Sequence, residues 1–202
     1  MSLIIKENRE YDLLEEGLYH GIVIWIYDLG TQFNPTYDNY SQKMLLAWEL
    51  PEARMTIEKE GHKLDVPRVI SKKYTKSLNE KSILYRDLVS WRGKAFTENE
   101  INSFDVSKLI KKNCMLQIIH KQAANGKTYA SISNILPLYK ATQKEPESQT
   151  RIYSIEYMDN IPEGTPQWIE EIIRKSEEFK NQKTVEDDVL HVNDTALDDV
   201  PF

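Results

Sequence analysis

The chain has 202 residues, of which 40% are hydrophobic, and its formal net charge is −6. This length predicts one main globular domain with additional segments, and no stretch approaches the roughly 18 to 20 apolar residues of a membrane-spanning helix. A single cysteine, Cys114, excludes an internal disulfide and a multi-cysteine zinc site and fits a reducing compartment. Because the acidic first residues do not resemble a signal peptide, we expect a cytoplasmic protein with no membrane partner.

Charge is unevenly distributed along the sequence. Residues 1–60 have a net charge of −6, residues 61–140 carry 15 basic against 6 acidic side chains, and residues 141–202 have a net charge of −9. A basic middle and an acidic end indicate one region that meets a polyanion and another that repels or imitates it. A solvated surface with an acidic solubilising tail would give the same distribution, so charge alone does not decide.

Three strands are predicted in the first part of the chain, at residues 19–28, 43–50 and 66–77. A loop rich in turn-forming residues, 29–40, separates the first two, and a charged connection precedes the third. Alternation in the first strand separates a face of isoleucines from a face that carries two aromatic rings. The two faces consist of Ile22, Ile24 and Ile26, and of Val23, Trp25 and Tyr27.

A helix is predicted directly after the third strand. Ser77 and Glu80 form a capping box, apolar residues recur at helical spacing as far as Trp91, and Gly93 ends the helix.

A further short helical turn is predicted from a second capping box, formed by Thr97 and Glu100. Two more strands follow at residues 114–122 and 127–138, and the Asn-Gly pair at 125–126 between them is a strong hairpin signal. Three strands, a helix and two strands make up the element order of the OB-fold, a Greek-key barrel that binds single-stranded nucleic acid or oligosaccharide. We therefore predict a mainly β protein with a five-stranded OB-fold barrel, a helix between strands three and four, and a nucleic-acid-binding domain over residues 1–140.

The composition changes beyond this domain. Residues 141–150 are polar and predict a linker, and residues 151–181 predict a packed segment with an amphipathic helix that Thr165 caps. Residues 182–202 predict a disordered acidic tail. The apolar stripe of the helix consists of Trp168, Ile169, Ile172, Ile173 and Phe179. This stripe needs a partner surface, either the barrel or another subunit.

Sequence signatures of catalysis are largely absent. The chain has no phosphate loop, no dinucleotide-binding glycine motif, no nucleophile elbow and no zinc-protease motif. Glu178-Phe179-Lys180 matches the E-x-K of some nucleases by letter, but it falls on the predicted helix. The histidines have no ligand spacing; they are His20, His62, His120 and His191. We therefore expect no enzymatic activity and no cofactor.

A binding site for single-stranded nucleic acid has stronger support. Such binding needs cations for the phosphates and aromatic faces on which unpaired bases stack. The candidate residues are Arg68, Lys72, Lys73, Tyr74 and Lys76 of the third strand, Lys121, Lys127 and Tyr129 of the last hairpin, and Trp25, Tyr27, Phe33 and Trp48 of the first two strands and their loop. The same rings could instead pack in the core, and the sequence leaves this alternative open.

The chain ends in a short acidic and aromatic sequence, "ALDDVPF". Asp198, Asp199, Val200, Pro201 and Phe202 combine carboxylates, an aromatic ring and a free α-carboxylate, which is typical of a docking peptide. This ending resembles the acidic tip of bacterial and phage single-stranded DNA-binding proteins. In that family the tip recruits replication, recombination and repair proteins, and the resemblance implies the same role for these five residues.

The body of the chain, with "DLGTQF", "WELP" and "SWRGKAFT", resembles the OB-fold single-stranded DNA-binding proteins of phages and prophages. The resemblance implies a non-catalytic protein that coats and protects single-stranded DNA. The short, charged linker and the C-terminal helix depart from the bacterial type, so whether the chain forms a homo-oligomer stays open. A protein-interaction scaffold and a replication-associated nuclease are the alternative functions, and RNA binding is a variant of the main one.

Overall fold

The computed structural model describes residues 13–59, 61–138, 142–157 and 161–181. The strands are β1 (Gly17–Asn34), β2 (Asn39–Lys59), β3 (His62–Thr75), β4 (Asn113–Gln122), β5 (Thr128–Leu136) and β6 (Arg151–Tyr153). The helices are α1 (Ile83–Arg92), α2 (Glu98–Ser103) and α3 (Gln167–Arg174), with short 3₁₀ turns η1 (Val106–Leu109) and η2 (Ile155–Tyr157).

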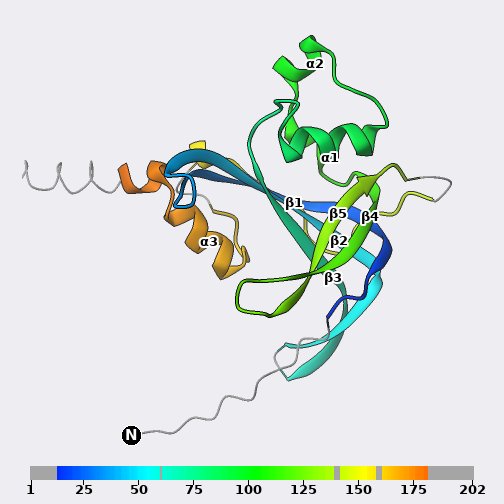
Figure 1. Cartoon of the computed structure of the whole chain (residues 1–202). Helices are drawn as coiled ribbons and strands as arrows, with labels where there is room; N and C mark the ends of the chain where they lie inside the picture. Colours follow the sequence, from blue (N-terminus) through cyan, green and yellow to red (C-terminus); the bar gives the residue numbers. More distant parts are fainter. Residues whose placement is uncertain (1–12, 60, 139–141, 158–160, 182–202) are drawn as a thin grey trace, which may run out of the picture.

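The first five strands form one antiparallel sheet in the order β3-β2-β1-β4-β5. The sheet curls into a half-barrel, so that its two end strands, β3 and β5, contact each other (Figure 1). Helix α1 lies between β3 and β4 in the chain and contacts β3 and β5. The prediction of a mainly β protein with five barrel strands and a helix between the third and fourth is confirmed.

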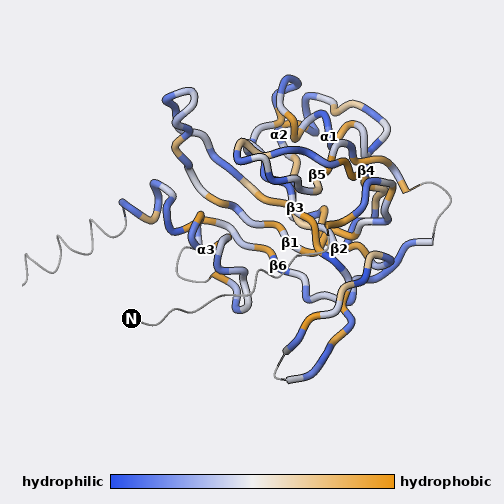
Figure 2. The backbone as a smooth tube through the Cα atoms, turned by 60° about the horizontal axis from the view of Figure 1, so that its bottom comes forward, coloured by the Kyte–Doolittle hydropathy of each residue, from blue (hydrophilic) through white to orange (hydrophobic). Residues whose placement is uncertain are grey.

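The first two strands are much longer than predicted, and the third begins at His62 and ends at Thr75. The expected loop at 29–40 is mostly strand, because β1 and β2 stay paired from Thr31 and Gln42 out to Asn34 and Asn39. The loop prediction was therefore wrong except at the tip of the hairpin. The β2–β3 hairpin extends in the same way to Lys59 and projects beyond the barrel at the bottom of Figures 1 and 2.

A bulge changes the predicted faces of β1. Val23 pairs with Trp48 and Trp25 pairs with Ala47, so Ile24 is an extra residue on β1. An extra residue reverses the alternation beyond it. As a result Val23 and Ile26 share the barrel core, and the prediction that Val23 lies on the aromatic face was wrong.

Two apolar clusters lie on opposite faces of the sheet. The barrel core, on the inner face, includes Val23, Met44, Leu46, Trp48, Tyr74, Leu84, Leu88, Cys114, Leu116 and Ile132. The second cluster, on the outer face, consists of Tyr27, Leu29, Leu45, Ala47, Tyr153, Ile169 and Ile173. In Figure 2 hydrophobic stretches gather where the strands meet, and the peripheral turns are hydrophilic. Cys114 is buried, as expected of a small apolar group.

The ends of α1 and α2 follow local sequence chemistry. Ser82, not Ser77, caps α1, because its hydroxyl accepts from the backbone N–H of Tyr85 at 3.1 Å. Gly93 ends α1 at a φ of +70°, a conformation that favours glycine. The capping box predicted at Thr97 and Glu100 is confirmed at the start of α2.

The segment predicted as a linker is fastened to the barrel where the structure describes it. The buried carboxylate of Glu49 accepts hydrogen bonds from the backbone N–H groups of Glu147 at 2.9 Å and Ser148 at 2.7 Å. Asn113 exchanges two hydrogen bonds with the backbone of Lys144. The domain boundaries drawn from the sequence stay predictions, and residues 182–202 lie outside the described residues.

The predicted C-terminal helix is α3, which packs on the outer face of β1 (Figure 1). Pro166 occupies its N-cap position without a side-chain cap. The prediction that Thr165 caps this helix was wrong, because the Thr165 hydroxyl lies 2.9 Å from the hydroxyl of Tyr27 and donates to the carbonyl of Pro162. The apolar stripe of this helix was expected to pack on the barrel or on another subunit. The barrel covers Ile169 and Ile173, whereas Trp168 is 45% exposed.

Candidate nucleic-acid interface

An open groove with a volume of about 780 Å³ lies on the outer face of β1, β2 and β3. Helix α3 and the turn that leads into α1 flank it. It is lined by Leu29, Gln32, Phe33, Lys43, Lys73, Tyr74, Thr75, Ser77, Asn79, Lys81, Ser82, Ile83 and Ile172. Segments from four parts of the chain therefore build one concave surface.

Strand register explains which side chains of β3 reach the groove. Lys73 pairs with Leu45, and Thr75 pairs with Lys43. Because Leu45 belongs to the outer cluster, the odd-numbered residues at this end of β3 lie on the outer face. Tyr74, between them, points to the barrel core.

The groove is electropositive. Among the described residues that line it, three are lysines and none is Asp or Glu. Lys73 and Lys81 are exposed, and Lys43 is half-buried and donates to the hydroxyl of Thr75 at 2.8 Å. Amine groups on a concave surface without opposing carboxylates are suited to binding the phosphates of a nucleic acid backbone.

Exposed aromatic rings continue the groove at the tip of the β1–β2 hairpin. Phe33 is 47% exposed and Tyr40 is 57% exposed, and their ring centroids lie 5.1 Å apart. Tyr37, in the turn between them, is 75% exposed. At the other side of the groove the side chain of Ile83 is 52% exposed. The flat aromatic faces of Phe33, Tyr37 and Tyr40 are what unpaired bases need for stacking.

The inner face of β3 carries a buried polar cluster. Asp87 of α1 accepts hydrogen bonds from the hydroxyl of Tyr74 at 2.8 Å and from Nζ of Lys72 at 2.7 Å. Burial, together with the negative charge of Asp87, raises the pKa of Tyr74 well above its usual range. These groups join β3 to α1 and are bound to one another.

The prediction that Tyr27, Trp48 and Tyr74 stack on bases was wrong. Tyr27 and Trp48 are fully buried, and Tyr74 is 2% exposed, so none of them can offer a face to a base. Tyr27 is covered by α3, and Trp48 fills the barrel core. Trp25 is half-buried beneath the C-terminal segment and donates from Nε1 to the carbonyl of Gln149 at 3.2 Å.

The predicted cations are divided between several surfaces. Lys73 lines the groove, whereas Lys72 pairs with Asp87 and Lys76 pairs with Asp28 at 2.6 Å. Arg68 donates to the carbonyl of Arg54 and does not line the groove.

The last hairpin is a separate exposed surface. Lys121, Lys127 and Tyr129 are exposed at the end of the β4–β5 hairpin and do not line the groove. Their role in binding stays a prediction. The predicted docking residues Asp198, Asp199, Val200, Pro201 and Phe202 lie outside the described residues.

The sequence reading missed Lys43, Lys81 and Tyr40. Lys43 and Tyr40 were assigned to a strand start and a loop, although alternation along β2 already placed Lys43 on the same face as Leu45. Lys81 lies in the turn before α1, and no periodic signal places a turn residue relative to a strand. Only the three-dimensional path of this turn brings Lys81 to the groove.

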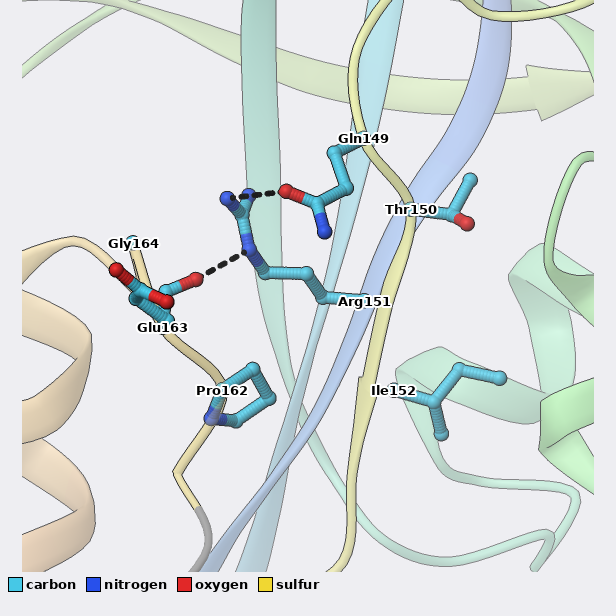
Figure 3. A pocket seen from close by; sticks show the side chains of 7 residues that line it. All are labelled: Gln149, Thr150, Arg151, Ile152, Pro162, Glu163 and Gly164. Atoms are coloured by element: carbon cyan, nitrogen blue, oxygen red, sulfur yellow. Dashed lines mark hydrogen bonds between the residues drawn. The ribbon is translucent and has the colours of Figure 1, made fainter.

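A second hollow, with a volume of about 550 Å³, lies between β6 and the segment before α3 (Figure 3). The guanidinium of Arg151 reaches across it, donating from Nε to the carbonyl of Glu163 at 3.1 Å and from a terminal nitrogen to the side chain of Gln149 at 3.4 Å. The same group lies over the ring of Trp25. These contacts assign Arg151 to holding the C-terminal segment against β1.

Within the part of the chain that the structure describes, no three His, Cys, Asp or Glu side chains gather as metal ligands would. Across residues 13–59, 61–138, 142–157 and 161–181, no helix has the length and apolar character needed to traverse a bilayer. No protein-family model and no curated protein sequence matches this chain.

Proposed function

We propose that this protein binds single-stranded DNA in the groove on β1, β2 and β3 and has no catalytic role. The observation that supports this most directly is the groove itself, whose lining, over the residues that the structure describes, has three lysines and no carboxylate, beside an exposed pair of rings. Lys43, Lys73 and Lys81 would neutralise phosphates, and Phe33 with Tyr40 would stack on bases. Binding of this kind reads no base edges, so it is expected to be tolerant of sequence.

The strand order and the position of α1 also support this proposal. The strand order β3-β2-β1-β4-β5, the contact between β3 and β5, and α1 between β3 and β4 agree with a five-stranded Greek-key OB barrel. The outer face of strands two and three and the loop between strands one and two are binding surfaces in that fold. We infer that the half-barrel is an OB-fold and that the groove lies at its ligand-binding face.

We further propose that the acidic C-terminus recruits replication, recombination or repair proteins. Deletion of residues 190–202 should abolish capture of such partners and leave the affinity for oligo-dT unchanged or slightly higher, because an acidic segment competes with DNA for the lysines. Pull-down and binding measurements on the same preparation test this. A large loss of DNA affinity would contradict the separation of roles.

The test of DNA binding is fluorescence anisotropy of labelled oligo-dT over a range of salt concentrations. The double variant Lys73→Gln/Lys81→Gln should bind more weakly and flatten the log–log salt dependence by about 0.7 per phosphate contact removed. Lys108→Gln/Lys112→Gln, which removes two exposed lysines outside the groove, is the charge control. An unchanged slope in the double variant would show that these groove lysines do not contact the DNA phosphates.

The same assay separates the alternative functions. A protein-interaction scaffold would not bind oligo-dT at all, and a nuclease would cleave the labelled strand when magnesium is added. Oligo-rU and duplex DNA in parallel titrations test whether binding is selective for unpaired DNA.

A further inference from the structure

The C-terminal segment continues the sheet. One edge of β1 pairs with β2. The opposite edge pairs with β4, but only as far as Ile22. β6 takes over at Trp25 and pairs in parallel with β1 as far as Tyr27. The backbone of β1 is therefore completed by residues that come more than a hundred positions later in the chain.

The outer face of the same part of β1 is covered by α3. Ile169 and Ile173 are fully buried against Tyr27 and Leu29. This packing brings Ile172, on the same helix, to the edge of the groove, where it forms part of the lining.

A carboxylate fixes the segment that follows α3 to β1, at Thr31, beyond the residues that pair with β6. Glu178 accepts hydrogen bonds from the backbone N–H of Thr31 at 2.8 and 3.1 Å and from the Thr31 hydroxyl at 2.7 Å. Burial opposes ionisation of Glu178, but the hydrogen bonds from Thr31, from its own backbone N–H and from Ser176 together lower its pKa. Gly30 makes the approach feasible, because a Cβ at this position would lie 2.7 Å from Glu178 Oε2 and from Ser176 Cβ.

A second hydrogen bond joins the same part of β1 directly to the helix. Gln32 Nε2 donates to the carbonyl of Ile172 at 2.9 Å and to the carbonyl of Leu29 at 2.6 Å. Both Gln32 and its neighbour Phe33 line the groove. The residues of β1 that hold α3, Thr31 and Gln32, therefore directly precede Phe33, which lines the groove.

We propose that Glu178 is a positioning residue, which fixes α3 as the second wall of the DNA-binding groove. The inference rests on the proposed function, and it makes the C-terminal segment up to residue 180 part of the binding unit. Glu178 does not line the groove, so it acts through Thr31 and the placement of Ile172. Without this contact α3 should separate from the end of β1, and one side of the groove should open.

The experiment compares Glu178→Ala with Glu177→Gln in the full chain. Both variants lose one negative charge. Glu177 is the adjacent residue and pairs with Lys180 at 2.7 Å, and it does not contact Thr31, so it is the control for the charge change. Thr31→Val is a second variant, which removes one hydrogen bond to Glu178 without a change in charge. Each protein is titrated with labelled oligo-dT at several salt concentrations, and amide hydrogen exchange of residues 167–180 is followed.

Glu178→Ala should weaken oligo-dT binding about tenfold, since hydrogen bonds to a charged acceptor are lost. The salt slope should stay unchanged, because no lysine of the groove is removed. Exchange should accelerate in residues 167–180, Thr31→Val should give a smaller effect in the same direction, and Glu177→Gln should bind like the wild type. If Glu178 had only a structural role, Glu178→Ala would lower the melting temperature but would not weaken oligo-dT binding at temperatures where the protein is folded.

Two results would overturn the inference. Faster exchange of α3 with unchanged affinity would show that the wall is not needed, and unchanged exchange would show that Glu178 does not position the helix. A wild-type protein that fails to bind oligo-dT would instead refute the proposed function, on which the inference depends.

Discussion

The two faces of β3 carry similar residues but differ in what they contact. On the inner face Lys72 and Tyr74 are bound to Asp87, and the ring of Tyr74 takes part in the barrel core. On the outer face Lys73 and Thr75 lie in an open groove. The comparison shows that a lysine-rich strand is not by itself a binding surface, because half of its side chains face the core.

The largest expected effect is on the inner face. Asp87→Ala leaves the largely buried amine of Lys72 and the hydroxyl of Tyr74 without their acceptor. Removing one partner of a buried ion pair should lower the free energy of unfolding by about 3 kcal/mol. Urea denaturation measures this.

The control for this variant is Asp65→Ala, which breaks an exposed pair with Arg54. It should change the free energy of unfolding by less than about 1 kcal/mol. Equal losses in the two variants would mean that the inner face of β3 is no more buried than the hairpin surface.

The next effect is on the aromatic end of the groove. Phe33→Ala should weaken oligo-dT binding by about 1 to 3 kcal/mol, the contribution of one stacked base, with little change in stability because the ring is half exposed. Tyr129→Ala, on the β4–β5 hairpin, tests the other exposed ring in the same titration. A larger loss for Tyr129→Ala would move the main stacking surface from the groove to that hairpin.

The smallest effect concerns the hydroxyl of Tyr74. Tyr74→Phe should lower the free energy of unfolding by about 1 kcal/mol and leave DNA affinity unchanged, because the ring faces the core. Burial and Asp87 raise the pKa of this phenol, so the folded state favours its neutral form. The resulting stability is present below about pH 10 and decreases as pH rises above it.

A pH series of denaturation curves measures this dependence. The wild type should lose more stability than Tyr74→Phe between neutral pH and pH values above 10. Parallel curves for the two proteins would show that Tyr74 does not titrate differently in the folded state.

Several features could be predicted from the sequence because they depend on neighbouring residues. The strand-helix-strand order, the hairpin between β4 and β5, the capping box at Thr97 and the C-terminal glycine of α1 all follow from local periodicity and turn chemistry. The sequence also identified Phe33 and Lys73 as candidates, and both line the groove.

The remaining site residues could not be assigned from the sequence, for two physical reasons. Period-two alternation shows that Lys73 and Tyr74 lie on opposite faces, but not which face another element will cover. The bulge at Ile24 also reversed the faces of β1 without a sequence signal.

The sequence by itself determined the type and order of the elements and the presence of basic and aromatic residues in them. Only the tertiary structure decided which of those residues are buried. Burial depends on α1 packing against the inner side of β3, the strand that precedes it, and on α3 packing against the outer side of β1, a contact between segments far apart in the chain. No local pattern encodes such a contact, because its free energy arises only when both surfaces are already folded.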